Sequence, residues 1–259
     1  MQKKGFNLIG IGLILYCVNV SLPFFGISST GLAITFLPVS AIASYILIGL
    51  GIRNINPFRN KYKTASVLFI EAACLIGLAS LLLPLFTKDG LTKLFDVYSH
   101  MINYPSYDIS DTYLLNLMVD LFKGVNSYLI LILMIEVLAV VGIFIFLSGI
   151  KYEKINDEHK KRLNKYGKCS AIFNVVTLIT CIFLIHCYAQ FFSTVLKDPA
   201  NDVKIILNFF GLMAAFPVIV VFSILTLVNK IKFIVNIFKT YSNRIIESEE
   251  NSTAIEELI

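Results

Sequence analysis

Charged residues are scarce in this sequence. Asp, Glu, Lys and Arg together make up 15% of its 259 residues, whereas hydrophobic residues make up 57%. Soluble domains carry about 25% charged and about 45–50% apolar residues. The composition therefore excludes an ordinary soluble domain and is typical of a membrane protein.

The signature motifs of enzymes are also missing. The chain contains no His-Glu-x-x-His, Gly-x-Ser-x-Gly or Gly-x-Gly-x-x-Gly motif and no phosphate-binding loop. Metalloproteases, hydrolases, and dinucleotide- or ATP-binding proteins therefore lack support. The acidic stretch 108–111 lacks the glycine and the distal glutamate of a calcium loop. We expect no enzymatic activity, no catalytic residue, no metal and no cofactor.

Paired cysteines are absent as well. The five cysteines all lie within or at the edges of apolar runs, and none belongs to a Cys-x-x-Cys motif: they are Cys17, Cys74, Cys169, Cys181 and Cys187. This distribution argues against both a disulfide framework and a zinc site.

The net charge of +5 does not indicate a nucleic-acid partner. The basic residues cluster next to apolar runs and do not follow one amphipathic face, so the rule that positive loops stay in the cytoplasm explains them better. The partner predicted from composition is the lipid bilayer.

Six apolar stretches are long enough to cross a membrane, which takes about 20 helical residues. They are approximately 5–26, 31–52, 65–86, 127–150, 169–195 and 205–228. The first exceeds a signal-peptide core and has no clean cleavage site, so we expect it to be retained. Only a few small residues separate the first two spans, which predicts a tight helical hairpin.

The distribution of Lys and Arg predicts the orientation. These residues gather at the amino-terminus, in the loops 53–63 and 151–168, and after residue 228. The sequence thus predicts an all-α, six-pass protein of the cell membrane with both termini in the cytoplasm. Residues 1–240 form a single transmembrane domain in this prediction, and 241–259 form an acidic cytoplasmic tail.

Two further segments have a helical pattern but are too polar to span. In the outer segment 87–126, apolar residues recur at helical spacing over 91–102 and 114–122. A turn at 103–107 separates the two stretches, and the second is predicted to begin at a cap, Ser110 or Asp111, and to end at Gly124. This pattern predicts two short amphipathic helices.

A third amphipathic segment follows the sixth span. One face is predicted to be apolar and the other polar and in contact with anionic lipid. The apolar face holds Ile231, Ile234, Val235 and Phe238, and the polar face holds Lys230, Lys232, Asn236 and Lys239.

Residues 53–69 resemble residues 151–173. Asn60-Lys61-Tyr62 corresponds to Asn164-Lys165-Tyr166, and both follow a helix that ends in Gly-Ile and a basic residue. Two readings stay open. The hairpins are either a parallel repeat, or they share the Lys, Asn and Tyr that are common at cytoplasmic membrane borders.

Three ionisable residues lie within the predicted spans: Glu71, Glu136 and His186. Placing a charge at the bilayer centre costs about 2.5–3.5 kcal/mol or more, so each of these residues requires a structural or functional explanation. One hypothesis is a proton or cation relay, because a desolvated carboxyl and an imidazole can change charge near neutral pH. The alternative is hydrogen bonding between helices, with Glu71 reaching Arg59 or Lys63. Asn174 is among the amides expected to form such bonds.

One stretch resembles a known group of proteins. It contains Phe36-Leu37-Pro38, then Ser44-Tyr45-Ile46-Leu47-Ile48-Gly49-Leu50, then a basic loop with Phe58, followed by Ala65. Over about residues 32–69 the chain is similar to uncharacterised small multi-pass membrane proteins of low-GC Gram-positive bacteria. The group often has aspartate where this chain has Val39. The resemblance implies a bacterial membrane protein and implies no activity.

Three functional hypotheses follow. The leading one is a non-enzymatic membrane component, such as an accessory, immunity-type or complex-forming subunit, with a protein partner or a second copy of the chain. The next is a small secondary transporter or channel-like protein that uses Glu136 and His186. The most distant is an intramembrane enzyme.

Overall fold

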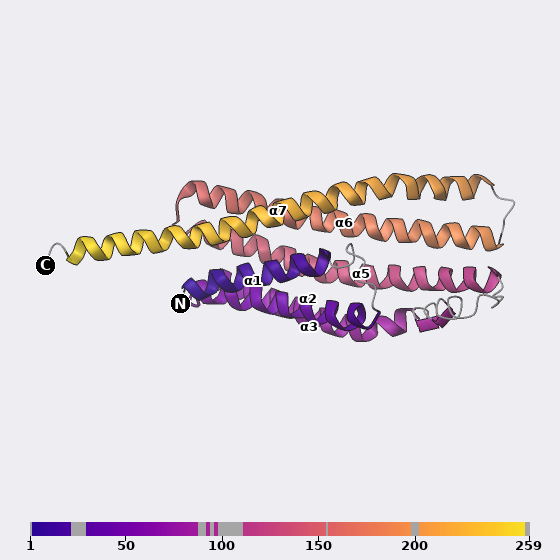
Figure 1. Ribbon diagram of the computed structural model, residues 1–259, viewed down its shortest axis with the longest axis horizontal. Coiled ribbons are helices and arrows are strands. Elements are labelled where there is room, and N and C mark those ends of the chain that lie inside the picture. The colour runs from indigo at the N-terminus through magenta and orange to yellow at the C-terminus, as the bar shows by residue number, and fades with distance from the viewer. Residues whose placement is uncertain are drawn as a thin grey trace. The chain divides into compact units, whose positions relative to one another are not determined.

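The structure is a computed structural model of the chain. It describes residues 2–21, 30–87, 92–93, 96–97, 111–153, 155–197 and 202–256. Within these ranges the chain is helical and contains no strand, so the all-α prediction is confirmed for the described residues. Figure 1 shows the helices in chain order.

Six helices account for most of the described residues. They are α1 (Gln2–Ser21), α2 (Thr30–Ile55), α3 (Asn60–Thr87), α5 (Asp111–Ile150), α6 (Asp157–Lys197) and α7 (Asp202–Glu256). Local sequence explains their ends. Pro57 disfavours helical backbone at the residue before it, just after α2. At the start of α6, Asn156 Oδ1 accepts a bond from the Glu158 backbone N–H, which caps the helix.

Four segments are long and apolar enough to cross a membrane. They are Asn60–Leu83, Thr112–Ile150, Asp157–Val195 and Val203–Lys239. The chain is therefore an integral membrane protein. The described parts of the first two predicted spans, Lys4–Val18 and Val39–Ile55, are apolar but shorter. Six membrane crossings thus stay a prediction, and the turn expected between the first two spans lies outside the described residues.

The chain divides into two compact units. Unit 1 comprises Met1–Gly77, Ile135–Asn174 and Ile224–Ile259, and unit 2 comprises Leu78–Met134 and Val175–Ser223. Helices α3, α5, α6 and α7 contribute to both units. Each unit has its own packing.

In unit 1, helices α1 and α2 pack closely as antiparallel neighbours, which confirms the pairing of the predicted hairpin. A Cβ placed on Gly51 would lie 2.7 Å from the carbonyl oxygen of Gly5, and one on Gly12 would lie 2.8 Å from that of Ser44. The two helices run in opposite directions, because residue 5 lies beside residue 51 and residue 12 lies beside residue 44. Glycine permits this approach because it has no side chain, as in other membrane helix pairs.

The basic loop after α2 is held to the end of α5 in unit 1. Arg59 forms a 2.9 Å ion pair with Glu153 and also donates to the carbonyl of Gly149. The hydroxyl of Tyr62 donates to the same carboxylate. The buried Tyr62 ring lies where a side chain on Gly149 would stand. These contacts fix the amino-terminal turn of α3 against α5.

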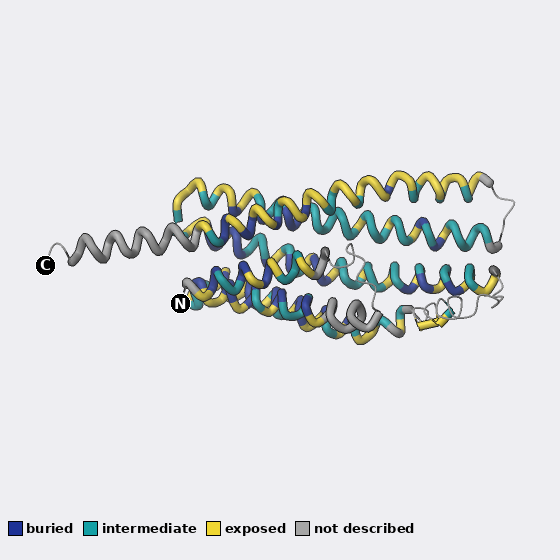
Figure 2. Tube along the Cα trace, viewed as in Figure 1, coloured by how far each residue is buried: buried dark blue, intermediate teal, exposed yellow. Residues whose placement is uncertain are grey.

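Unit 2 is held by aromatic contacts between α5 and α6. Phe122 stacks on Tyr188 and Phe192 of α6, with ring centroids 5.4 and 5.7 Å apart. Tyr128 of α5 also contacts Phe86 of α3 at 6.3 Å between centroids. Along α7, in contrast, most side chains in this unit are exposed (Figure 2).

Helix α5 corrects the prediction for the outer segment. The helix begins at Asp111, one of the two expected caps, but it continues through Gly124 to Ile150 as one element. An interior glycine costs only about 1 kcal/mol, which the apolar run beyond it offsets. The prediction of a separate second amphipathic helix is therefore wrong. The first one and the turn at 103–107 fall almost wholly outside the described residues.

Helix α7 corrects the prediction for the segment after the sixth span. It is a single helix as far as Glu256, so helical backbone extends through most of the predicted acidic tail. The predicted faces are confirmed only in part. Ile234 is buried and Lys232 and Lys239 are exposed, as expected, but Ile231 and Val235 are exposed whereas Lys230 and Asn236 are buried. The buried side of α7 also includes Phe233 and Ile237, and Lys230 on this side lies against the Tyr16 ring, a contact that a hydrophobicity pattern does not reveal.

The close contact of α1 with α2 makes a testable prediction. Gly51→Ala must move the two backbones apart, and overpacking of this kind costs about 1–3 kcal/mol, more than the helix propensity gained. We expect a lower unfolding temperature in detergent. Gly77→Ala is the matched control, because its Cβ would lie at an ordinary 3.4 Å from Ile42 Cδ1. Equal stability of the two variants would contradict the close packing.

Candidate functional site

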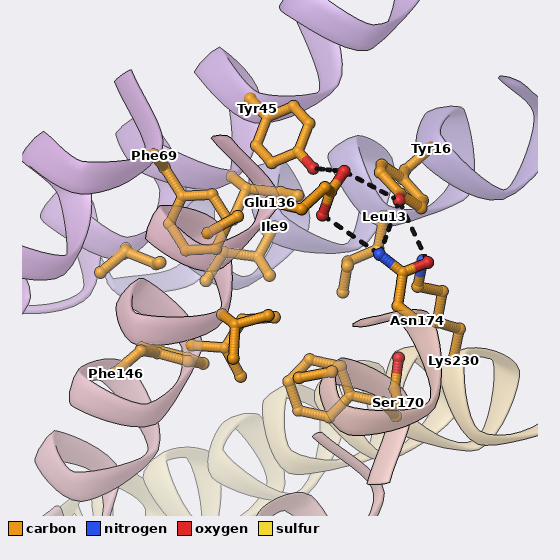
Figure 3. A pocket seen from close by; sticks show the side chains of 17 residues that line it. Ile9, Leu13, Tyr16, Tyr45, Phe69, Glu136, Phe146, Ser170, Asn174 and Lys230 are labelled. Atoms are coloured by element: carbon orange, nitrogen blue, oxygen red, sulfur yellow. Dashed lines mark hydrogen bonds between the residues drawn. The ribbon is translucent and has the colours of Figure 1, made fainter. Parts of the chain in front are cut away.

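A buried polar cluster lies at the centre of unit 1. It consists of Tyr16 from α1, Tyr45 from α2, Glu136 from α5, Asn174 from α6 and Lys230 from α7, and we call it the Glu136 cluster. Figure 3 shows these five side chains converging from their helices.

Helical spacing explains why each residue points inward. On α1, Ile9 and Leu13 line the same cavity as Tyr16, seven and three residues before it. On α2, Ile48 and Ile52 stand three and seven residues after Tyr45. Residues at these spacings share one helix face. Each polar residue thus interrupts an otherwise apolar stripe that faces the interior.

Both carboxylate oxygens of Glu136 accept hydrogen bonds. The hydroxyls of Tyr45 and Tyr16 donate to Oε1, the latter at 3.2 Å, and the amide of Asn174 donates to Oε2 at 3.1 Å. The same amide donates to the Tyr16 hydroxyl at 3.2 Å. The three donors come from three other helices, so Glu136 links α1, α2 and α6 to α5.

A buried cation completes the cluster. The Nζ atom of Lys230 lies 3.5 Å from the centroid of the Tyr16 ring, and Lys230 is only 8% exposed. A desolvated cation–π contact of this kind contributes about 2 kcal/mol. Tyr16 therefore joins the two charges, since its hydroxyl bonds to Glu136 and its ring face binds Lys230.

The space beside the cluster is small. The cavity that these residues line has a volume of about 40 Å³. Sites for small organic ligands measure about 300–1,000 Å³, whereas a water molecule needs about 10–15 Å³ on the same kind of measure. The cavity has room for water-sized species and not for an organic substrate. Apart from Ser170, its remaining walls are apolar, with Phe69, Ile143 and Phe146 among them.

The three candidate residues from the sequence lie in different settings. Glu136 is buried at 7% exposure at the centre of the cluster. Glu71 is exposed on α3, and Arg59, one of its expected partners, pairs with Glu153 instead. His186 is exposed on α6 in unit 2. Within unit 1, only Glu136 of the three occupies a buried polar site.

Other members of the cluster were assigned differently or missed in the sequence. Asn174 was expected to form bonds between helices, and it does so. Lys230 was placed at the membrane border, and this is wrong because it is buried against Tyr16. Tyr16 and Tyr45 were not identified. Their spacing to Leu13 and Ile48 on one helix face was the signal that could have found them.

No group of His, Cys, Asp and Glu suited to a metal ion occurs among the described residues. None of the five cysteines forms a disulfide bond. No protein-family model, curated protein or solved structure matches the chain. The site therefore has to be interpreted from its own geometry.

The two charges of the cluster can be tested with a double-mutant cycle, which measures how strongly their contributions to stability are coupled. Glu136→Gln or Lys230→Met alone leaves one buried charge without its counterpart, which typically costs about 3–5 kcal/mol. The double variant removes both charges and should lose less stability than the two single losses combined. Unfolding temperatures in detergent measure the coupling.

A matched control uses a neighbouring lysine. Lys232 is exposed on the same helix, so Lys232→Met should show no coupling to Glu136→Gln. If the stability losses of Glu136→Gln and Lys230→Met were additive, as expected for the control pair, a joint role for the two charges would be contradicted.

Proposed function

We propose that this protein is a non-enzymatic component of a bacterial cytoplasmic membrane, acting as an accessory, immunity-type or complex-forming subunit. The observation that carries the proposal is the closure of the Glu136 cluster. The carboxylate is occupied by donors from α1, α2 and α6, and the cavity beside it admits no organic substrate. Such a cluster holds helices in register, as buried polar groups do in other assemblies.

The surface of the membrane helices supports a role in assembly. In unit 2, α7 exposes large apolar side chains along one face, including Val203, Leu207 and Phe210, which are 65–69% exposed. Their spacing of four and three residues forms a continuous stripe. Lipid chains or the helix of a partner can cover such a stripe, and aromatic residues within it suit close packing against a protein.

We also propose that both termini lie in the cytoplasm. The support comes from the sequence, because Lys and Arg gather in the loops 53–63 and 151–168 and after residue 228. The similarity of residues 32–69 to membrane proteins of low-GC Gram-positive bacteria supports the assignment to a bacterial cell membrane.

Site-specific photo-crosslinking tests the subunit proposal. A photoreactive phenylalanine analogue at Phe210, on the exposed stripe of α7, should give one adduct of defined mass in intact membranes. The same analogue at Phe69, which is 2% exposed, is the buried control and should give no adduct with another chain. The partner, or a second copy of the chain, should also co-purify in fixed ratio in mild detergent. A monomer without adducts would contradict the proposal.

A second candidate is a small transporter or channel-like protein that moves protons. The observation in its favour is that Glu136 and Lys230 are both buried beside a cavity of water size, and such pairs occur in proton pathways. His186 is not needed in this form of the hypothesis.

Proton flux into proteoliposomes tests this second candidate. Glu136→Gln keeps the size of the side chain but removes its charge, so uptake followed by a pH-sensitive dye should fall by about tenfold or more. Glu71→Gln, which changes an exposed acid on α3, should leave the rate unchanged. If correctly folded Glu136→Gln protein matched the parent protein in rate, proton transport through Glu136 would be excluded.

A further inference from the structure

A second recess in unit 1 has a different chemical character from the Glu136 cluster. It lies between the carboxyl-terminal turns of α5 and the first three turns of α6, and we call it the lysine groove. Its volume is about 710 Å³, which is within the range of sites for small ligands. It therefore has the room that the cavity beside Glu136 lacks.

The two sides of the lysine groove differ in polarity. The α5 side includes Phe144, Leu147 and Ile150, which belong to the apolar part of the helix. On the α6 side, Lys160, Asn164 and Lys168 recur every four residues, so they lie on one face about 6 Å apart along the axis. The groove thus joins an apolar wall to a polar one.

Positive charge dominates the lysine groove. Four lysines line it, Lys151, Lys160, Lys161 and Lys168, and Asp157 is its one acidic residue. Asp157 pairs with Lys160 at 3.1 Å, and the Asp157 side chain is exposed at the start of α6. The other three lysines form no ion pair with a described residue. Their charges are available to an anion from outside the chain.

Lys168 connects the charged part of the groove to the apolar part. Its Nζ atom lies 5.7 Å from the centroid of the Phe144 ring, on the opposite wall. Long lysine side chains commonly lay their methylene groups on apolar surface and extend the ammonium group toward polar surroundings. An anion bound by Lys168 would therefore lie next to an apolar surface.

We propose that the lysine groove binds an anionic phospholipid. The phosphate is held by Lys151, Lys161 and Lys168, and an acyl chain lies against Phe144, the half-buried apolar side chain of the groove. Basic pockets between membrane helices recognise lipid headgroups in this way, and each lysine near the surface adds to the attraction. A free phosphate compound would satisfy the lysines but would leave the half-buried Phe144 ring uncovered, whereas a lipid would satisfy the lysines and cover the ring.

Lipid titration with native mass spectrometry tests the proposal. The detergent-solubilised protein is titrated with phosphatidylglycerol, phosphatidylcholine, or glycerol phosphate without acyl chains. We expect retention of phosphatidylglycerol over the other two. The triple variant Lys151→Gln, Lys161→Gln and Lys168→Gln should bind phosphatidylglycerol at least about tenfold more weakly.

The matched control removes three charges elsewhere in unit 1. Lys61→Gln, Lys63→Gln and Lys165→Gln change exposed lysines that do not line the groove, and this variant should retain the affinity of the parent protein. Equal losses in the two triple variants would overturn the site in favour of general charge attraction. Equal affinity for glycerol phosphate and phosphatidylglycerol would overturn the lipid in favour of a free phosphate compound. Unfolding temperatures confirm that each variant is folded.

Discussion

A carboxylate inside a membrane protein needs donors and a counter-charge, and in unit 1 these come from four other helices. Glu136 on α5 accepts from Tyr16, Tyr45 and Asn174, and Lys230 lies against the Tyr16 ring. Without these partners, the charge would cost several kcal/mol in an apolar interior. The positions of α1, α2, α6 and α7 around α5 are therefore coupled to one side chain.

This coupling explains how apolar helices acquire a unique register. Lipid-facing helices gain little from hydrophobic contact with one another, because lipid chains are equally apolar. Close glycine contacts bring α1 to α2 at Gly5 and Gly51, but such contacts alone could slide by a turn. A tyrosine hydroxyl has to reach a particular oxygen atom, so Tyr16 and Tyr45 define which turn of each helix faces Glu136. Close packing brings the helices together, and the hydrogen bonds of the Glu136 cluster determine their register.

The sequence reveals part of this arrangement and conceals the rest for physical reasons. A glutamate in an apolar run stands out, so Glu136 was identified, and Asn174 was expected to bond between helices. Lys230 follows a span and precedes Lys232, which is also the pattern of lysines that extend toward the membrane surface. Tyrosine is common at membrane borders, so Tyr16 and Tyr45 carried no distinguishing signal. Likewise, Gly124 resembles a helix stop, although the flanking residues continue α5.

The basic residues of unit 1 differ in what neutralises their charge. Some pair with groups of the fold itself, whereas others are left to interact with molecules outside the chain. Lys230 lies against Tyr16 near Glu136, and Arg59 pairs with Glu153, so both contribute to the fold. Lys151, Lys161 and Lys168 line an open groove that contains one acidic residue, already bonded to Lys160. A fold gains nothing from gathering like charges, which repel one another. An anion from outside the chain would offset this repulsion, and the half-buried Phe144 ring beside the lysines favours an anion that carries an acyl chain.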